Sequence, residues 1–279
     1  MRSFSIRVPF TDRRLHLALE RGGALSFPGG MQFGTNLKAD YFRKGKWQGS
    51  VDLGSGLVTN VGVLALANDS LWSATNALNS LFKSLKYHAT GTSATAAATT
   101  DIKLNTPSAN GGQTPVAGTQ VLVSAANLQK WQTVATINYT GTETVTEWGL
   151  FAYDSTLPAI TALSDATGSP FTAGSGTTGT VTGTPLTASS ATVMGQQMSI
   201  LENTGNATPS WGLVLSNTTS VVTVPAWYKV ADGTAGANPA NTNTYVIRPI
   251  MWDRKILSIG VNNGDSIQFT YTLTIASGG

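Results

Sequence analysis

The chain contains no cysteine and little charge, and both absences narrow what it can do. Without cysteine, the 279-residue sequence has neither disulfides nor thiolate metal ligands. Charged residues make up only 11% of the chain, against roughly 25% in an ordinary soluble domain. Thr, Ser, Asn, Gln and Gly must therefore cover much of the surface. That composition suits a protein whose faces are largely occupied by neighbours; a secreted β-protein is the alternative.

Long apolar runs are missing as well. No stretch of about 18 apolar residues is present to cross a membrane as a helix. The first ten residues alternate between polar and apolar side chains instead of forming the apolar core of a secretory signal. We therefore expect no membrane association.

The charge that is present is concentrated near the N-terminus. Residues 1–50 hold nine basic and three acidic residues, a net charge of +6, whereas the rest of the chain has a net charge of −3. Residues 1–55 also resemble short alternating strands separated by glycine and proline turns. We interpret them as an extended basic arm that completes its folding on a neighbour. The side chains predicted to contact that partner are Arg2, Arg7, Arg13, Arg14, Arg21, Arg43, Lys44 and Lys46.

A basic segment of this kind can bind nucleic acid or an acidic protein surface. Nucleic-acid binding would favour aromatic side chains interleaved with the charges. Aromatic residues occur in the segment, but in no recognisable nucleic-acid module. An acidic protein surface is therefore the favoured partner.

What the sequence does contain is β-strand pattern. Residues 265–276 read D-S-I-Q-F-T-Y-T-L-T-I-A, with polar and apolar residues in alternation. Successive side chains of a strand point to opposite faces, so this segment predicts a strand with one apolar and one hydroxyl-covered face. Similar segments recur without helices between them, which favours antiparallel sheets. The predicted fold class is mainly β: an antiparallel β-sandwich or jelly-roll-like body with one amphipathic helix and an extended N-terminal arm.

The rest of the chain divides into a main domain and an insertion. Residues 56–153 and 245–279 are predicted to form the main β-sandwich domain, with its helix at about 69–86, where apolar residues recur at spacings of three and four. Gly141-Thr142 is predicted to turn a hairpin. Residues 154–244, rich in Thr, Ser and Gly, form a β insertion between two neighbouring strands, either as a folded domain or as a long loop.

Groups capable of catalysis are sparse. The two histidines, His16 and His88, lie in no nucleophile pattern. Glu143 and Glu147 share a face of one predicted strand, but stand about 13 Å apart along it, beyond the roughly 5–10 Å that glycosidase chemistry needs. Neither metal-ligand spacing nor a phosphate-binding loop is found. We expect no enzyme activity, no metal and no cofactor.

The aromatic residues fall into two groups. Those predicted to form the structural core are Trp148, Phe151, Trp252, Phe269 and Tyr271. The candidate receptor-facing aromatics of the insertion are Trp211, Trp227 and Tyr228. Exposure of these three rings on one surface would favour stacking on sugars, whereas their burial would favour a scaffold.

One ordered set of motifs resembles a known class of proteins. The motifs are residues 87–92 (Y-H-A-T-G-T), 136–141 (T-I-N-Y-T-G), 147–151 (E-W-G-L-F), 252–254 (W-D-R) and 263–275 (N-G-D-S-I-Q-F-T-Y-T-L-T-I). Together they resemble structural proteins encoded in tailed-bacteriophage genomes, over about 57–153 and 248–279. The likeness does not cover the basic arm, and the insertion stands where the relatives have a short connection. The resemblance implies a particle component and carries over no catalytic residue.

The expected function is that of a non-enzymatic structural component of a bacteriophage virion, assembled in the host bacterial cytoplasm. The favoured role is a capsid decoration (cement) protein that binds the major capsid protein through the N-terminal arm. The alternatives are a tail or neck structural protein, and a receptor- or carbohydrate-binding module of the virion. A symmetric homo-oligomer is expected, with a trimer favoured.

Overall fold

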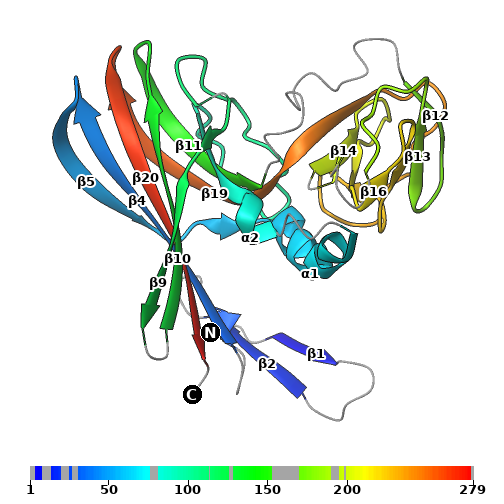
Figure 1. Ribbon diagram of the computed structural model, residues 1–279, viewed down its shortest axis with the longest axis horizontal. Helices are drawn as coiled ribbons and strands as arrows, with labels where there is room; N and C mark the ends of the chain where they lie inside the picture. Colours follow the sequence, from blue (N-terminus) through cyan, green and yellow to red (C-terminus); the bar gives the residue numbers. More distant parts are fainter. Residues whose placement is uncertain are drawn as a thin grey trace.

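The fold is mainly β and antiparallel, which confirms the predicted class. The computed structural model (Figure 1) describes residues 4–7, 14–19, 25–26, 31–75, 81–112, 114–125, 128–152, 170–189, 195–197 and 199–277. Within these ranges the strands pair antiparallel throughout.

The first sheet has the alternating C-terminal strand near its centre. Its strands are β1 (Phe4–Arg7), β2 (Arg14–Leu19), β3 (Leu25–Ser26), β4 (Met31–Arg43), β5 (Lys46–Gly54), β9 (Thr119–Ala125), β10 (Leu128–Asn138) and β20 (Asp265–Ser277). They run in the order β1-β2-β3-β4-β20-β10-β9, and β5 pairs with β4. On β20 the apolar side chains from Ile267 to Leu273 are at most 1% exposed. The polar residues between them stay partly exposed on the other face.

The second sheet packs on the first and is organised by β19. Its strands are β6 (Leu57–Val58), β7 (Leu85–Gly91), β8 (Val116–Ala117), β11 (Glu143–Ala152), β14 (Ser199–Asn203), β15 (Ser210–Leu213), β18 (Tyr228–Lys229) and β19 (Tyr245–Val261). The first residues of β19, up to Pro249, pair with β14, and those from Ile250 onward pair with β11. One strand therefore belongs to both lobes of the molecule (Figure 1). The strands that flank the insertion, β11 and β19, are neighbours.

The described part of the insertion has a core of its own. Its small sheet consists of β12 (Phe171–Gly174), β13 (Thr178–Val181), β16 (Ser216–Asn217) and β17 (Val221–Thr223). Phe171, Val222 and Trp227 pack against Leu201 of β14 and Ile247 of β19 in one buried cluster. The insertion is thus a folded β lobe and not a long loop.

The helix predicted at about 69–86 is wrong at its start, whereas its end differs by two residues. The structure has α1 over Asn60–Thr75 and α2 over Leu81–Ser84, and residues 76–80 lie outside the described ranges. The helix begins earlier because the Thr59 hydroxyl caps it, accepting a hydrogen bond from the Gly62 N–H at 3.1 Å. The helical region ends earlier because Leu85 begins β7, paired with β11.

The extended arm predicted over residues 1–55 is wrong for its second half. β4 pairs with β20 over its full length, from Arg43 opposite Asp265 to Met31 opposite Ser277, and β5 extends the same sheet. Leu37 is fully buried in the main core. The sequence misleads because the strand that pairs with this segment lies at the other end of the chain. β1 and β2 continue the sheet as a ribbon beyond the sandwich (Figure 1).

The hairpin predicted at Gly141-Thr142 is also wrong. β10 pairs with β9 and β20 in the first sheet, whereas β11 pairs with β7 and β19 in the second. The chain therefore crosses from one layer of the sandwich to the other. The Tyr139 N–H donates to the Asp265 carbonyl at 2.9 Å, and the Thr140 N–H donates to the Asn110 carbonyl at 2.8 Å. These bonds fix the crossing.

Large aromatic side chains fill the space between the sheets. The five predicted core residues Trp148, Phe151, Trp252, Phe269 and Tyr271 are each at most 5% exposed. Four of them lie between the sheets, whereas Phe151 packs in a separate cluster with Leu104 of the β7–β8 loop. The Trp148 and Tyr271 rings stack with centroids 5.6 Å apart. The Tyr271 hydroxyl accepts a hydrogen bond from the Trp252 indole and donates one to the Asp253 carboxylate, both at 2.9 Å. The polar tips of these rings are thus satisfied inside the core.

A fully buried ion pair holds the long loop between β7 and β8 against the second sheet. The guanidinium of Arg254 on β19 donates to the carboxylate of Glu147 on β11 at 2.7 Å through Nη2 and 3.0 Å through Nε, and both side chains are 0% exposed. Glu147 also accepts the backbone N–H groups of Asn105 and Thr106. Arg254 reaches the carboxylate of Asp101 at 2.8 Å. Both the carboxylate and the guanidinium therefore have further hydrogen-bond partners, which compensate the cost of burying their charges.

Removing Arg254 should destabilise the protein strongly. In Arg254→Met, Glu147 keeps a buried carboxylate without its cation, and we expect a loss of roughly 3–5 kcal/mol in the free energy of unfolding. Urea titration checks this. The double variant Glu147→Gln/Arg254→Met should recover part of the loss because the charge is gone. Lys46→Met, at an exposed position, serves as the control and should change stability by no more than about 0.5 kcal/mol. An equal loss of stability in Arg254→Met and in the control variant would contradict the structural role of the buried ion pair.

Candidate interaction surfaces

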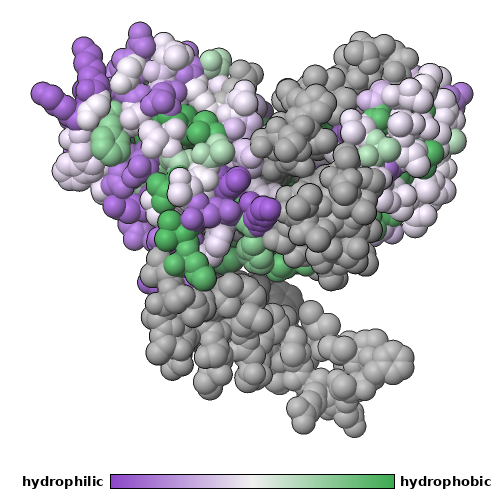
Figure 2. Space-filling view, viewed as in Figure 1, coloured by the Kyte–Doolittle hydropathy of each residue, from purple (hydrophilic) through white to green (hydrophobic). Residues whose placement is uncertain are grey.

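The most strongly charged described feature is the tip of the β4–β5 hairpin. Lys44 and Gly45 form its two-residue turn with φ of 48° and 76°, the positive values that a type I′ turn requires. Arg43, Lys44 and Lys46 are all exposed around this turn. Next to them Trp47 is 61% exposed. Hydrophilic residues project from this end of the molecule at the upper left of Figure 2.

The base of the tip is anchored to β20. The Tyr41 hydroxyl donates to the Asp265 carboxylate at 2.6 Å and accepts from Arg43 at 3.0 Å. The hydrogen bond from Tyr41, with the nearby charge of Arg43, lowers the pKa of Asp265. The tip is therefore held by paired strands and a side-chain network. It presents cations and an indole from a backbone that is already ordered, which suits docking on an acidic surface.

Of the other predicted contact residues, the structure describes two, and both lie in another part of the first sheet. Arg7 and Arg14 are paired positions of the β1–β2 ribbon. Arg2, Arg13 and Arg21 lie outside the described residues. Sequence reasoning did not select Trp47 as a contact residue. The sequence signal that could have identified Trp47 is Lys44-Gly45, a pair typical of a tight turn, which places the neighbouring residues at a hairpin tip.

The three candidate receptor-facing aromatics do not form an exposed platform. Trp211 and Trp227 are each 3% exposed, and the Trp227 indole donates to the Ser175 carbonyl at 2.9 Å. Tyr228 is partly exposed and packs on Trp211 with ring centroids 4.9 Å apart. The prediction that these rings face a receptor is wrong for both tryptophans, because the insertion uses them to build its interior and its contact with the main domain.

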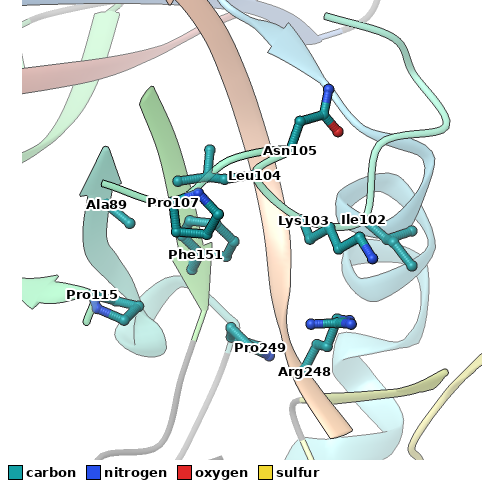
Figure 3. Close-up of a pocket in the computed structure, with 10 residues that line it drawn as sticks. All are labelled: Ala89, Ile102, Lys103, Leu104, Asn105, Pro107, Pro115, Phe151, Arg248 and Pro249. Atoms are coloured by element: carbon teal, nitrogen blue, oxygen red, sulfur yellow. The ribbon is translucent and has the colours of Figure 1, made fainter. Parts of the chain in front are cut away.

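A cavity of about 330 Å³ lies where the β7–β8 loop approaches β19 (Figure 3). Leu104, Pro107 and Phe151 form much of its apolar lining, and Lys103 and Arg248 lie together at one side. Both cations contact the carboxylate of Glu202, Lys103 at 3.8 Å and Arg248 through its Nε. The cavity can accommodate an apolar group, and its lining contains no Ser, Thr, His, Asp or Glu.

His88 is buried and neutral. Burial lowers its pKa to about 3. Its Nδ1 accepts a hydrogen bond from the Trp148 indole N–H at 3.3 Å, so Nε2 carries the proton and donates to the Thr133 hydroxyl at 3.2 Å. This histidine is a core hydrogen-bonding group. His16 lies in β2.

The acidic residues of the main domain also make structural contacts. Burial raises the pKa of Asp253 to about 7. Glu143 accepts hydrogen bonds from Ser108 and Asn110, and Glu147 is held by Arg254. Both glutamates thus bind the β7–β8 loop. Within the described ranges no group of three or more His, Asp or Glu side chains could hold a metal ion.

Comparisons with known proteins leave the family open: no family model, no curated protein and no solved structure matches the chain. Neither of the helices in the described part of the chain is long and apolar enough to cross a membrane.

His88 and Asp253 should give the protein two opposed pH dependences. Folding lowers the pKa of His88 from 6.5 to about 3, so its contribution destabilises the fold as the pH falls through that window. Folding raises the pKa of Asp253 from 3.8 to about 7, so its contribution destabilises the fold as the pH rises through that window. Between about pH 4 and 6.5 the two effects largely cancel in the native protein.

Single substitutions should expose each effect. In Asp253→Asn the free energy of unfolding should rise with pH by roughly 1 kcal/mol per unit over this range, and in His88→Gln it should fall by a similar amount. Urea titrations at several pH values between 4 and 7 measure both slopes. Slopes of the same sign in the two variants would contradict the assignment.

Proposed function

We propose that this chain is a non-enzymatic structural component of a bacteriophage virion: a capsid decoration protein that binds acidic surface of the major capsid protein. The observation that carries the proposal is the exposed hairpin tip of Arg43, Lys44, Lys46 and Trp47 on a body with few charges. The partner surface would supply carboxylates for the cations and a shallow apolar contact for the indole. Tryptophan and arginine are the residues that most often dominate binding energy at such contacts.

The sandwich body supports a structural role. The motifs that resemble phage structural proteins contribute its interior: His88, Trp148, Arg254 and Phe269 are all 0% exposed. Away from that core, β20 and β10 carry hydroxyl and amide side chains, joined in places such as Gln132 to Thr272 at 3.0 Å. A face of this kind is nearly uncharged and can lie against neighbours without desolvating ions.

A tail or neck component is the second candidate, since the same resemblance covers both locations. A carbohydrate-binding role receives no support, because Trp211 and Trp227 are buried. Copies of the chain are proposed to act as a homo-oligomer within the particle, in the virion and not at a membrane. Nucleic acid is not proposed as a partner.

Charge reversal at the tip should weaken binding to particles. We expect Lys46→Glu/Trp47→Ser to lower the affinity for particles lacking this protein at least tenfold, and wild-type binding to weaken as salt rises. Co-sedimentation of labelled protein with particles measures both. Lys229→Glu makes the same charge change on the insertion lobe and should bind normally. Undiminished binding of the tip variant would contradict the proposed contact.

Substitutions are needed for this test, because deleting residues 1–50 would remove β4 from the centre of the first sheet. Immunogold labelling of purified particles separates the two locations. Gold label on the heads supports a capsid decoration protein. Label confined to tails or necks supports a tail or neck component. Absence of the chain from purified particles would contradict a virion role altogether.

A further inference from the structure

β9 is a long edge strand without the usual protection. It forms one end of the first sheet and pairs on one side with β10, in unbroken register. No described residue pairs with its other side. Its sequence, T-Q-V-L-V-S-A, contains no charge, proline or glycine. Val121 is 45% exposed and Leu122 is 65% exposed, and a hydrophobic strip runs over the region of β9 and β10 in Figure 2.

Three other edge strands of the described structure are protected. β8 and β18 are two residues long, and β5 carries charged residues and two register shifts against β4. Short, bulged or charged edge strands prevent pairing with another chain. β9 has none of these features, so its exposed backbone groups and apolar side chains are suited to a partner strand.

We propose that β9 pairs antiparallel with β9 of a second copy of this chain, about a two-fold axis at Leu122. Seven residues centred on Leu122 place that residue opposite itself, and Val121 opposite Val123 of the second copy. In β9 the register with β10 sets Val121 opposite Gln132 and Leu122 opposite Trp131, so Val121 and Leu122 lie on opposite faces of the sheet. An uncharged strand meets its own copy without repulsion.

The pairing joins two first sheets into one continuous sheet and satisfies backbone groups that water otherwise solvates. It yields a two-fold dimer as the unit of assembly, in place of the trimer favoured by sequence. The inference stands whether or not the chain is a virion component.

A lysine at the axis should prevent the pairing. Sedimentation equilibrium of the full chain should give twice the 29.0 kDa of one copy at tens of micromolar, whereas Leu122→Lys should raise the dimer dissociation constant at least tenfold, because two ammonium groups would meet at the axis. Val63→Lys replaces another exposed apolar side chain, 55% exposed on α1, and should leave the dimer intact. Circular dichroism confirms that each variant is folded.

Cysteine cross-linking tests the register independently of stability. Because the chain has no cysteine, Leu122→Cys should give a covalent dimer on oxidation and Val63→Cys should not. A monomeric or trimeric wild-type protein, an unchanged dimer in Leu122→Lys, or no cross-link through Cys at 122 would overturn the proposal.

Discussion

The buried contact between Arg254 and Glu147 is the constraint on which the rest of the main domain depends. The carboxylate is on β11 and the guanidinium on the neighbouring β19, and together they bind the backbone of the β7–β8 loop. That loop covers the second sheet, whose other face packs on the first through Trp148 and its aromatic neighbours. A charged pair this deep contributes little net stability compared with apolar packing, but it penalises every arrangement that leaves one ion alone. It therefore selects one loop conformation and one strand register.

Little of this interior could perform chemistry, and the proposed function follows from what remains outside. His88 and Asp253 are shifted in pKa, a property often associated with active sites. Here burial causes both shifts, and both groups are hydrogen-bonded to core aromatics or their neighbours. The outside offers a rigid basic tip, a hydroxyl-covered sheet face and an unprotected edge strand. All three suit contact with other proteins.

The sequence predicts the class of fold well, because alternation along β20 and burial of Trp148 and Trp252 depend on local pattern. It predicts connections poorly. Gly141-Thr142 looks like a hairpin turn, yet the strands on either side belong to different layers; β4 looks like an arm, yet it pairs with the far end of the chain. Pairing between strands far apart in the chain determines both the connection after β10 and the position of β4. A single sequence contains no signal for such pairing. Aromatic residues of the insertion could not be sorted into core and surface, since its small sheets bury even isolated tryptophans.

The single strand shared by both lobes has a mechanical consequence. β19 leaves the insertion at Pro249 and enters the main sheet at Ile250 without an intervening loop, so the two lobes have no flexible linker at this point. A pull on the insertion would load the hydrogen bonds between β19 and β11 along the strand axis, where many must break together. Force applied to the insertion would thus be transmitted directly into the strands of the second sheet.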